Sequence, residues 1–431
     1  MQKSDVGVAA RVASLLEQLL AAPLPLRLQA WDGSVTGPAH GPALIIRSRR
    51  ALRRVLWQPN EVGLGRAWVA GEIDVDGDLE EGLLRLETIG RDLAARPRLS
   101  IAEWADALRV AAALRVVGPP PRPPREEAVL RGATHSKSRD RAAVRHHYDV
   151  GNEFYDIVLG PSMAYSCAFW TRPNDPAYTL EDAQRDKLEL ICRKLGLQPG
   201  MRVLDVGCGW GALVIHAARE HGVRAVGITL SEGQAEYARK RAAEAGVAQD
   251  VDVRVQDWRD VDDGPFDAIA SIGMAEHLGA QMWDEYARTL HDLLTPGGRL
   301  LNHQIVRRPG PGRTGRTFIT AFVFPDGELL PLGDVVNAIE GADLEVRDVE
   351  SLREHYPRTL RQWVSNLEGQ WARAVELAGA GRARIWRLYM TGSALSFDAG
   401  RIGVAQVLAV RRRLDGGSGV PPTRDGWLSV R

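Results

Sequence analysis

The sequence predicts an α/β protein in which a doubly wound, parallel sheet follows a smaller N-terminal α+β unit. The chain has 431 residues, which is longer than one hydrophobic core usually organises. A proline-rich segment after residue 117 separates two parts with different patterns. In the second part, apolar strands and amphipathic helices alternate with short loops, as they do around parallel sheets.

The overall charge of the chain is balanced. It has 55 Lys and Arg residues and 55 Asp and Glu residues, so its formal net charge is zero. It is 45% hydrophobic and 26% charged, which is typical of a folded globular protein rather than a disordered one. Zero net charge argues against a general electrostatic attraction to nucleic acid, so no nucleic-acid partner is expected.

The three cysteines, Cys167, Cys192 and Cys208, lie apart and form no CxxC pair. They are too few for a disulfide framework and lack the spacing of a zinc site, so no metal is expected and a reducing cytoplasm fits best. No run of 18 consecutive apolar residues is present, and Glu17 interrupts the apolar N-terminal stretch. The sequence therefore predicts neither a membrane span nor a signal peptide.

Residues 1–117 are expected to form a small accessory domain. Apolar residues from Val8 to Leu20 recur with helical spacing. A hairpin is expected to turn at Asp32-Gly33, and the segment ALIIR after it is another strand candidate. The pattern from Leu79 to about Val117 is mostly helical. The first helix is expected either to pack within its own domain or to form the interface of a homo-oligomer.

Residues 118–141 are expected to link this domain to residues 142–431. Five prolines between Gly118 and Arg125 remove backbone donors and favour a stiff, extended chain.

Residues 142–431 have the pattern of a seven-stranded sheet. The strand candidates are residues 202–207, 223–230, 251–255, 266–272, 299–306, 344–349 and 403–410. A helical insertion lies between the last two strands, and one of its faces is apolar. That face is formed by Leu360, Trp363, Val364, Leu367 and Trp371. It is either ordinary core packing or the wall of a channel for a long apolar substrate.

A glycine-rich loop follows the first strand of this sheet, in the segment from Val203 to Gly211. Its glycines let the chain turn tightly and let a ligand approach the backbone. The spacing is GxGxG, whereas dinucleotide-binding folds have GxGxxG. Asp205 precedes the loop, and its carboxylate suits a zwitterionic amino-acid group better than a pyrophosphate. The loop therefore favours a methyltransferase over a dehydrogenase.

This loop resembles motif I of the Rossmann-like class I methyltransferases that use S-adenosylmethionine (SAM). Further segments narrow the resemblance, namely HHYDVGNEFYDIVLGPSMAYSCAFW, GITLSEGQ, QDWRD, GMAEH, LNHQIV and FVFPDGEL. Together they are similar to the cyclopropane-fatty-acyl-phospholipid synthase family, which includes the mycolic acid cyclopropane synthases. The similarity covers the chain from about Ala142 onward. The N-terminal part resembles the extra domain of the members that act on phospholipids.

The resemblance implies a SAM site at the carboxyl ends of the strands. The implied residues are Tyr165, Ser166, Asp205, Gly207, Cys208, Gly209, Gly211, Thr229, Leu230, Ser231, Gln234, Asp257 and Trp258. Their chemistry is suitable, because hydroxyl and amide groups can bind ribose hydroxyls and Trp258 offers an apolar face to adenine. Asp257 is expected to accept a hydrogen bond from the adenine amine.

The family adds the SAM methyl to the cis double bond of an acyl chain and then removes a proton, with bicarbonate as the base. The resemblance assigns this reacting site to Cys167, Glu276, His303, Ile305 and Tyr356. Cys167 and Ile305 are expected to contribute backbone groups, and a nucleophilic role for Cys167 is rejected because direct methyl transfer needs no covalent enzyme intermediate. A buried Glu276 beside an anion needs a proton or a cation nearby, which His303 is expected to supply.

Some positions depart from the family pattern, including Ala275, Thr320-Ala321-Phe322 and Ser393. They leave the product open between a cyclopropane and an exocyclic methylene. The whole pattern is most similar to the tuberculostearic acid branch, which converts oleoyl phospholipid to 10-methylene stearoyl chains. The expected function is this methylation, with cyclopropane synthesis as the alternative and a flavin-dependent reductase as an expected partner that acts on the product.

A phospholipid substrate requires contact with a membrane surface, so a cytoplasmic, peripherally bound protein at the inner face of the membrane is expected. Two arginine-rich runs are candidates for headgroup contact, with a solvated surface as the alternative. The first run is Arg47, Arg49, Arg50, Arg53 and Arg54, and the second is Arg122, Arg125, Arg131, Lys137, Arg139, Arg141 and Arg145. The rival classes are a SAM-binding module or small-molecule methyltransferase without lipid activity, and an RNA methyltransferase. The Glu276, His303 and Tyr356 set argues against the first, and the lack of dominant positive charge argues against the second.

Overall fold

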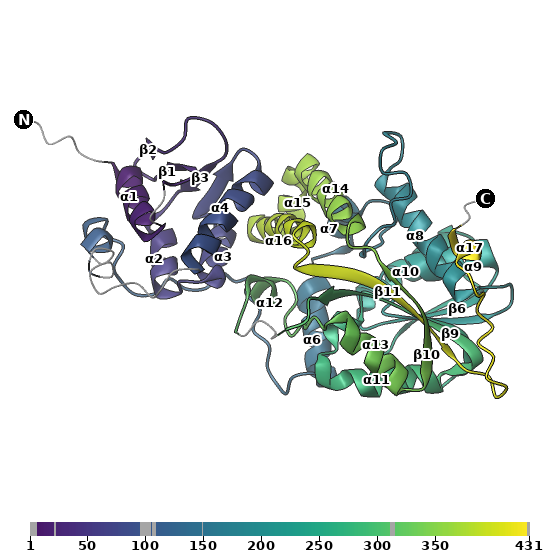
Figure 1. Ribbon diagram of the computed structural model, residues 1–431. Coiled ribbons are helices and arrows are strands. Elements are labelled where there is room, and N and C mark those ends of the chain that lie inside the picture. Colours follow the sequence, from purple (N-terminus) through teal and green to yellow (C-terminus); the bar gives the residue numbers. More distant parts are fainter. Residues whose placement is uncertain are drawn as a thin grey trace, which may run out of the picture. The chain divides into compact units, whose positions relative to one another are not determined.

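The computed structural model describes residues 7–20, 23–94, 105, 109–148, 150–310 and 315–428. The chain divides into two compact units, which Figure 1 shows in ribbon form. Unit 1 comprises Met1–Glu127, Gly315–Phe322 and Gly379–Leu395, and unit 2 comprises Ala128–Thr314, Val323–Ala378 and Ser396–Arg431. The division therefore differs from the expected boundaries of 1–117, 118–141 and 142–431, because two later segments complete the N-terminal unit.

Unit 1 is a small α+β fold around a sheet with the strand order β2-β1-β3-β4. Its elements are α1 (Val8–Leu20), β1 (Arg27–Gln29), β2 (Val35–Thr36), β3 (Ala43–Ile46), α2 (Arg49–Trp57), α3 (Glu61–Val69), β4 (Ile73–Asp76), α4 (Leu79–Ala94), α12 (Phe318–Phe322) and most of α16 (Ala380–Asp398). The expected hairpin is confirmed, because β1 and β2 pair antiparallel. Helix α1 packs into the core of its own unit through Ala9, Val12 and Ala13. Part of the helical segment expected between Leu79 and Val117 lies outside the described residues.

Most arginines of the first run bind other groups of unit 1, although Arg47, Arg49 and Arg50 are exposed. The Arg54 side chain is 3% exposed, and its Nε donates to Glu72 Oε2 at 2.8 Å. Arg47 pairs with Asp74 at 2.9 Å, and Arg53 donates to the carbonyl of Val116. These arginines hold the fold together, so the run as a whole is not the free basic surface that its sequence suggested.

The proline-rich segment also differs from a free linker. Its carbonyls are hydrogen-bonded to side chains of α2, since Trp57 Nε1 donates to Gly118 and Arg54 Nη1 donates to Arg122, each at 2.8 Å. Glu127 accepts two hydrogen bonds from Arg66, at 2.7 and 2.8 Å. The segment from 118 to 127 is therefore part of unit 1, and the last residues of the expected linker already belong to helix α6 (Lys137–Tyr148).

Unit 2 contains a seven-stranded sheet with the order β10-β11-β9-β8-β5-β6-β7. Its strands are β5 (Arg202–Val206), β6 (Arg224–Thr229), β7 (Val251–Val255), β8 (Phe266–Ile272), β9 (Leu294–Arg307), β10 (Leu344–Ser351) and β11 (Ile402–Arg411). Its helices are α6, α7 (Asn152–Leu159), α8 (Leu180–Leu195), α9 (Ala212–His221), α10 (Glu232–Glu244), α11 (Trp283–Asp292), α13 (Leu332–Gly341), α14 (His355–Gly369), α15 (Trp371–Ala378) and α17 (Asp425–Leu428). Three short 3₁₀ helices are η1 (Trp258–Asp260), η2 (Ala275–His277) and η3 (Ala280–Met282). This is the expected α/β class with the expected number of strands.

The expectation of a wholly parallel sheet is wrong at one edge. Strand β11 lies between β9 and β10 and pairs antiparallel with both. The strands β7, β6, β5, β8 and β9 pair in parallel. Because β11 is the last strand of the chain and returns into the sheet beside β9, it runs against the others. The five parallel strands are the ones that build the candidate site.

The helical insertion begins with α14, whose apolar face is buried. Leu360, Trp363 and Leu367 are 0–1% exposed, and Asn366 Nδ2 donates to the carbonyl of Val158 in α7 at 3.0 Å. Trp371 belongs to the separate helix α15, so the expected face is not one continuous helix. For α14 the structure supports core packing.

Within the described residues, no helix is both long enough and apolar enough to cross a membrane.

Replacing Glu72 by Gln tests the structural role of the first arginine run. Loss of the carboxylate leaves the buried Arg54 guanidinium without its partner, which costs about 3–5 kcal/mol of unfolding free energy. Chemical denaturation followed by tryptophan fluorescence measures the change. The exposed Arg49 provides the control, and R49Q is expected to change the stability by no more than about 0.5 kcal/mol. A loss below about 1 kcal/mol in E72Q would contradict the structural role of this pair.

Candidate functional site

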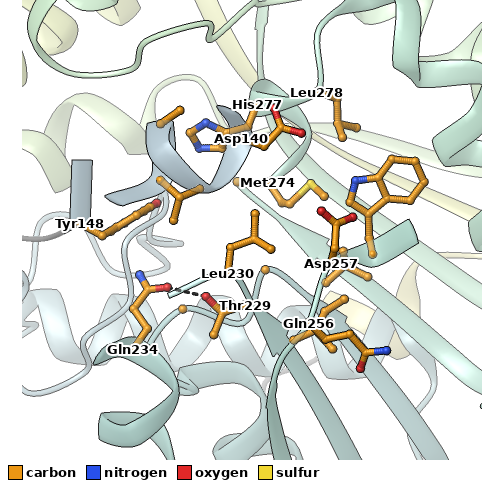
Figure 2. A pocket seen from close by; sticks show the side chains of 18 of the residues that line it. Asp140, Tyr148, Thr229, Leu230, Gln234, Gln256, Asp257, Met274, His277 and Leu278 are labelled. Carbon is orange, nitrogen blue, oxygen red and sulfur yellow. Dashed lines mark hydrogen bonds between the residues drawn. The ribbon is translucent and has the colours of Figure 1, made fainter. Parts of the chain in front are cut away.

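Two adjoining cavities lie at the carboxyl ends of the parallel strands of unit 2. Gly207, which follows β5, and Gly273, which follows β8, line both of them. Figure 2 shows Thr229, Leu230, Gln256 and Asp257 around the first cavity, next to β6 and β7. In sheets of this kind, ligands bind at this edge.

The glycine loop after β5 requires glycine for its backbone conformation. Gly207 has a φ of 84° and Gly211 has a φ of 80°, both in the left-handed region. A Cβ at Gly207 would lie 3.0 Å from the side chain of Met274, and one at Gly211 would lie 3.0 Å from Ala238. The loop is therefore closely packed on both sides. Its position leaves the backbone at Gly207 and Gly209 open to the cavities.

Most of the residues expected to bind SAM line these cavities. The first cavity contains Thr229, Leu230, Asp257 and Trp258, the second contains Tyr165, Ser166, Asp205 and Cys208, and both contain Gly207, Gly209 and Gln234. Ser231 and Gly211 do not line either one. Ser231 caps α10 by accepting a hydrogen bond from the backbone of Gln234 at 3.3 Å, and Gly211 begins α9. These two residues therefore fix the helices next to the site and do not line its cavities.

The polar groups of the first cavity are already paired with each other. Thr229 Oγ1 donates to Gln234 Oε1 at 2.7 Å, as Figure 2 shows. Asp257 accepts hydrogen bonds from Arg259 at both carboxylate oxygens, each at 2.7 Å. Burial opposes ionisation of Asp257, but these bonds outweigh it and lower its pKa. The carboxylate thus faces the cavity in its ionised form, held by Arg259 rather than free as the sequence suggested.

Arg259 also connects this cavity to helix α6. Its Nη2 donates to Asp140 at 2.8 Å, and its Nη1 donates to the carbonyl of His135. Asp140 and Tyr148 of α6 line the first cavity. Sequence reasoning missed Arg259, Asp140 and Tyr148, although Tyr148 lies in the quoted HHYD motif and Arg259 in the QDWRD motif.

The second cavity contains two buried charged groups of opposite sign. Lys187, from α8, and Asp205, from β5, are 2% and 3% exposed. Burial lowers the pKa of Lys187 to about 8 and raises that of Asp205 to about 7. Lys187 Nζ donates to Ser166 Oγ at 2.9 Å, whereas Asp205 Oδ1 has no hydrogen-bond partner among the described residues. No ion pair between the two is present in the described part of the chain. This is the arrangement that a zwitterionic amino-acid group can complete, with its carboxylate at Lys187 and its ammonium at Asp205.

Helix α8 also positions the segment that carries Ser166. Gln184 Nε2 donates to the carbonyls of Ala164 and Ser166, at 3.2 and 2.9 Å. Sequence reasoning missed Gln184 and Lys187, because both lie within an ordinary amphipathic helix. The only available signal was their one-turn spacing, which places them on the same helix face.

The expected reacting site is built around Glu276 on η2. Its Oε1 accepts a hydrogen bond from the backbone of Ile305 at 2.8 Å. Its Oε2 is buried without a hydrogen-bond partner among the described residues. Burial raises the pKa of Glu276 to about 7, so the carboxyl group is partly protonated near neutral pH. The adjacent residue His277 lines the first cavity, whereas Glu276 lines neither cavity.

His303 lies two residues before Ile305 on the same strand. Burial, with further contributions from the charges of Lys187 and Lys194, lowers its pKa to about 3. The imidazole is therefore neutral and supplies no cation to Glu276. Its Nδ1 is 3.3 Å from Gln406 Nε2, and its Nε2 has no partner among the described residues. A neutral His303 can accept or donate one further hydrogen bond, depending on its tautomer.

Cys167 and Tyr356 are connected to this region only through other residues in the described part of the chain. Burial raises the pKa of the Cys167 thiol, which fits the expectation that it is no nucleophile. Its Sγ is 3.7 Å from the carbonyl of Leu352, whose backbone donates to Val404, the residue paired with Ile305. Tyr356 is buried, and the ring of Trp363 lies between Tyr356 and the cavity residue Tyr165, with centroid distances of 6.2 and 5.4 Å.

Comparisons with known proteins identify the family of the chain. The family described as mycolic acid cyclopropane synthetase matches residues 135–407. A probable fatty acid methyltransferase of Mycobacterium tuberculosis is 40% identical over 414 residues, which cover 94% of each chain. The tuberculostearic acid methyltransferase UfaA1 of the same species is 34% identical over 94% of this chain and 92% of its own. The crystal structure of the mycolic acid cyclopropane synthase CmaA1 complexed with SAH and CTAB matches 62% of this chain and 97% of its own, at 34% identity and a TM-score of 0.58.

Replacing Lys187 by Met tests the role of the second cavity. The variant is expected to bind S-adenosylhomocysteine (SAH) at least about tenfold more weakly, because it loses a charge-assisted hydrogen bond to the ligand carboxylate. Its affinity for 5′-methylthioadenosine, which has no amino-acid group, is expected to stay within about threefold of the wild-type value. Isothermal titration calorimetry measures both.

The matched control for K187M is K194M on the same helix. Lys194 is equally buried but is paired with Glu350 and lines neither cavity. It is expected to affect stability without distinguishing the two ligands. Equal losses for both ligands in K187M would show a merely structural role for Lys187.

Proposed function

Because the chain belongs to the mycolic acid cyclopropane synthetase family and is a SAM-dependent methyltransferase, we propose that it methylates the cis double bond of unsaturated acyl chains in phospholipids. The proposed conversion is of oleoyl to 10-methylene stearoyl chains. One observation carries this proposal. Glu276 has a buried carboxyl oxygen without a hydrogen-bond partner among the described residues, and the adjacent residue His277 lines the first cavity. Such a group suits the removal of a proton after methyl transfer.

SAM, when bound, supplies an electrophilic methyl group. The chain's own residues bind and orient the cofactor through the loop after β5 and through Lys187, Asp205 and Gln234. An alkene is a weak nucleophile, so alignment and exclusion of water are the main catalytic demands. The cavity residue Tyr165 and the buried aromatic side chains of Tyr356 and Trp363 support this, since they make the neighbourhood of the cofactor apolar.

Methyl addition leaves a positive charge on the acyl chain, and one proton of the added methyl must then leave. Bicarbonate is proposed as the base. The residues proposed to hold it are Glu276, His303, Tyr356 and the backbone at Cys167 and Ile305. Two unpartnered buried atoms, Glu276 Oε2 and His303 Nε2, support a small polar ligand here. A protonated Glu276 can donate a hydrogen bond to an anion, and its raised pKa favours this form.

The methylene and cyclopropane products differ only in the last step. A hydride shift before proton loss gives an exocyclic methylene, whereas direct ring closure gives a cyclopropane. Similarity to UfaA1 across both units supports the methylene. Cyclopropane formation remains the second candidate, because the cyclopropane synthase CmaA1 matches 62% of this chain at the same 34% identity. A flavin-dependent reductase is proposed to act next on a methylene product.

Contact with the membrane surface is proposed to involve helix α6. Asp140, Ala143, Val144 and Tyr148 line the first cavity, and Arg141 and Arg145 on the same helix are exposed. Positive charge close to the cavity suits the phosphate of a lipid headgroup. Unit 1 is proposed to assist in lipid contact, which its exposed Trp57 and Val117 support. The proposed location is therefore the inner face of the cell membrane.

The direct test is to incubate the protein with SAM and oleoyl phospholipid vesicles and to analyse the released acyl chains. The two candidate products are isomers, so mass alone does not separate them. Proton NMR does, because an exocyclic methylene gives vinylidene signals and a cyclopropane gives signals at unusually high field. Vinylidene signals are expected. Cyclopropyl signals would overturn the methylene assignment, and an unchanged oleoyl chain would overturn the proposed function.

Replacing Glu276 by Gln is expected to reduce turnover at least about a hundredfold, a loss typical of removing one positioned catalytic group. SAH affinity is expected to stay within about threefold, because Glu276 lines neither cavity. Single-turnover kinetics and calorimetry separate the two effects. Full activity in E276Q would remove Glu276 from the mechanism.

Reversing the charge of Arg141 and Arg145 tests the membrane proposal. The double variant R141E/R145E is expected to bind phosphatidylglycerol vesicles at least about tenfold more weakly, since each basic residue near the surface contributes about 1 kcal/mol. Vesicle co-sedimentation at two salt concentrations measures this. Arg288 on α11 is also exposed, and R288E is the matched control. Equal losses in both variants would indicate a general charge effect.

A further inference from the structure

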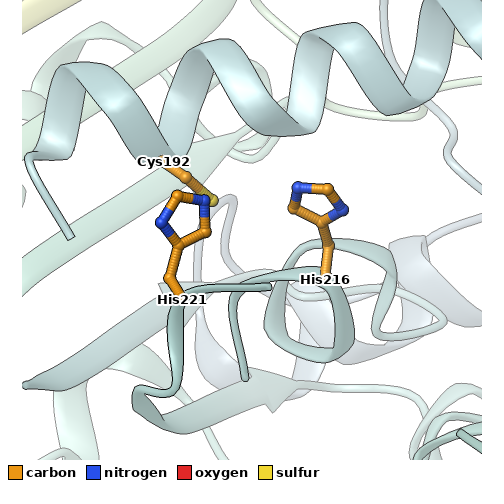
Figure 3. Close-up of side chains that lie close together, drawn as sticks. All are labelled: Cys192, His216 and His221. Carbon is orange, nitrogen blue, oxygen red and sulfur yellow. The ribbon is translucent and has the colours of Figure 1, made fainter. Parts of the chain in front are cut away.

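A cluster of metal-ligating side chains lies outside the cavities, where α8 packs against α9. It consists of Cys192, His216 and His221, whose ligand atoms all lie within 4.8 Å of one another. Figure 3 shows the Cys192 side chain extending from α8 toward the two imidazole rings. None of the three residues lines either cavity, so the cofactor site does not account for them.

A fourth donor completes the cluster. Glu189 lies one turn before Cys192 on α8, and its Oε2 is 3.3 Å from His216 Nε2 and 3.0 Å from His221 Nε2. Tetrahedral zinc binds nitrogen and oxygen at about 2.0–2.2 Å, which separates neighbouring ligand atoms by about 3.3 Å. Each of the two nitrogens is therefore already at the spacing of zinc ligands from the carboxylate oxygen. The Cys192 sulfur lies within 4.8 Å of the histidine ligand atoms, so metal binding requires the Cys192 side chain to move closer to the other ligands.

The surroundings of the cluster suit a bound cation. Arg193 Nε donates to Glu189 Oε1 at 2.6 Å, which orients the carboxylate so that Oε2 faces the two histidines. Such outer hydrogen bonds are typical of carboxylates that bind metals. Cys192 and His216 are buried, whereas the His221 side chain is 18% exposed and leaves a path for entry. A thiolate and a carboxylate together carry two negative charges, which balance the two positive charges of a divalent ion. The filled site therefore places no net charge in the interior.

We propose that Glu189, Cys192, His216 and His221 form a binding site for a zinc-like divalent cation. The site has one sulfur, two nitrogen and one oxygen donors, a set that zinc prefers over magnesium or calcium. On binding, the metal takes the place of the Cys192 thiol proton, which passes to solvent, and both histidines bind as neutral imidazoles. The spacing of the cysteines could not predict this site, because its ligands come from two different helices.

The site would fasten together two helices that shape the cofactor cavities. Helix α8 carries Lys187, and α9 begins directly after the glycine loop at Gly211. An ion held between them would stabilise unit 2 without entering the reaction. Its expected role is structural, since four protein ligands leave no open coordination position for catalysis.

Cobalt(II) is the probe for this proposal, because a thiolate bound to cobalt gives an intense charge-transfer absorption. The chelator-treated full-length protein is titrated with cobalt chloride alone, followed by zinc chloride as competitor. The wild type is expected to bind one equivalent of cobalt with this band, and zinc is expected to displace it. C192S is expected to lose the band, and H216N and H221N are expected to bind cobalt at least about tenfold more weakly.

The matched control is C208S, which removes another buried thiol and is expected to keep the band. Circular dichroism with thermal unfolding checks that each variant is folded, and H221N supplies the readout if C192S does not fold. A wild-type protein without the charge-transfer band, or a band that persists in folded C192S, would overturn the proposal. A rise in the unfolding temperature of the wild type with zinc, absent in H221N, would support it.

Discussion

The parallel strands of unit 2 end at one edge of the sheet, and this alignment positions the polar groups of the candidate site. Strand β5 delivers Asp205 and the glycine loop, β6 delivers Thr229, and β8 leads into Glu276. Their pairing brings groups from distant parts of the sequence together at this edge. This arrangement buries ionisable side chains, and burial raises the pKa values of Asp205 and Glu276. The site therefore holds charges and hydrogen-bonding atoms that a ligand can complete.

Buried polar groups that a ligand can complete are present both in the second cavity and near η2. In the second cavity, Lys187 and Asp205 are buried near each other without forming an ion pair, which suits a zwitterion that contacts both. Near η2, Glu276 and His303 each retain an unpartnered buried atom, which suits a small polar ligand. A fold that only needed stability would replace such groups with apolar ones. Their presence next to the glycine loop supports binding and catalysis as the reason for them.

Much of the fold and the site could be predicted from local sequence. The glycine loop, Asp205 and the strands from 251 to 255 and 266 to 272 were correctly predicted, because they depend on short motifs and apolar runs. Partners in three dimensions could not be predicted. The arginine run resembled a basic surface, but Glu72 and Asp74 neutralise part of it inside unit 1. Lys187 and the cysteine–histidine cluster were not predicted for the same reason. They lie in amphipathic helices, and only the packing of α8 identifies their neighbours.

The central claim is that the protein methylates a double bond and that a proton then leaves the added methyl group. SAM with a trideuterated methyl group tests both steps together when oleoyl phospholipid is the acceptor. The account predicts a product chain that retains two of the three deuterons, whichever of the two isomers forms. A product that retains all three deuterons, or an oleoyl chain without any label, would contradict it.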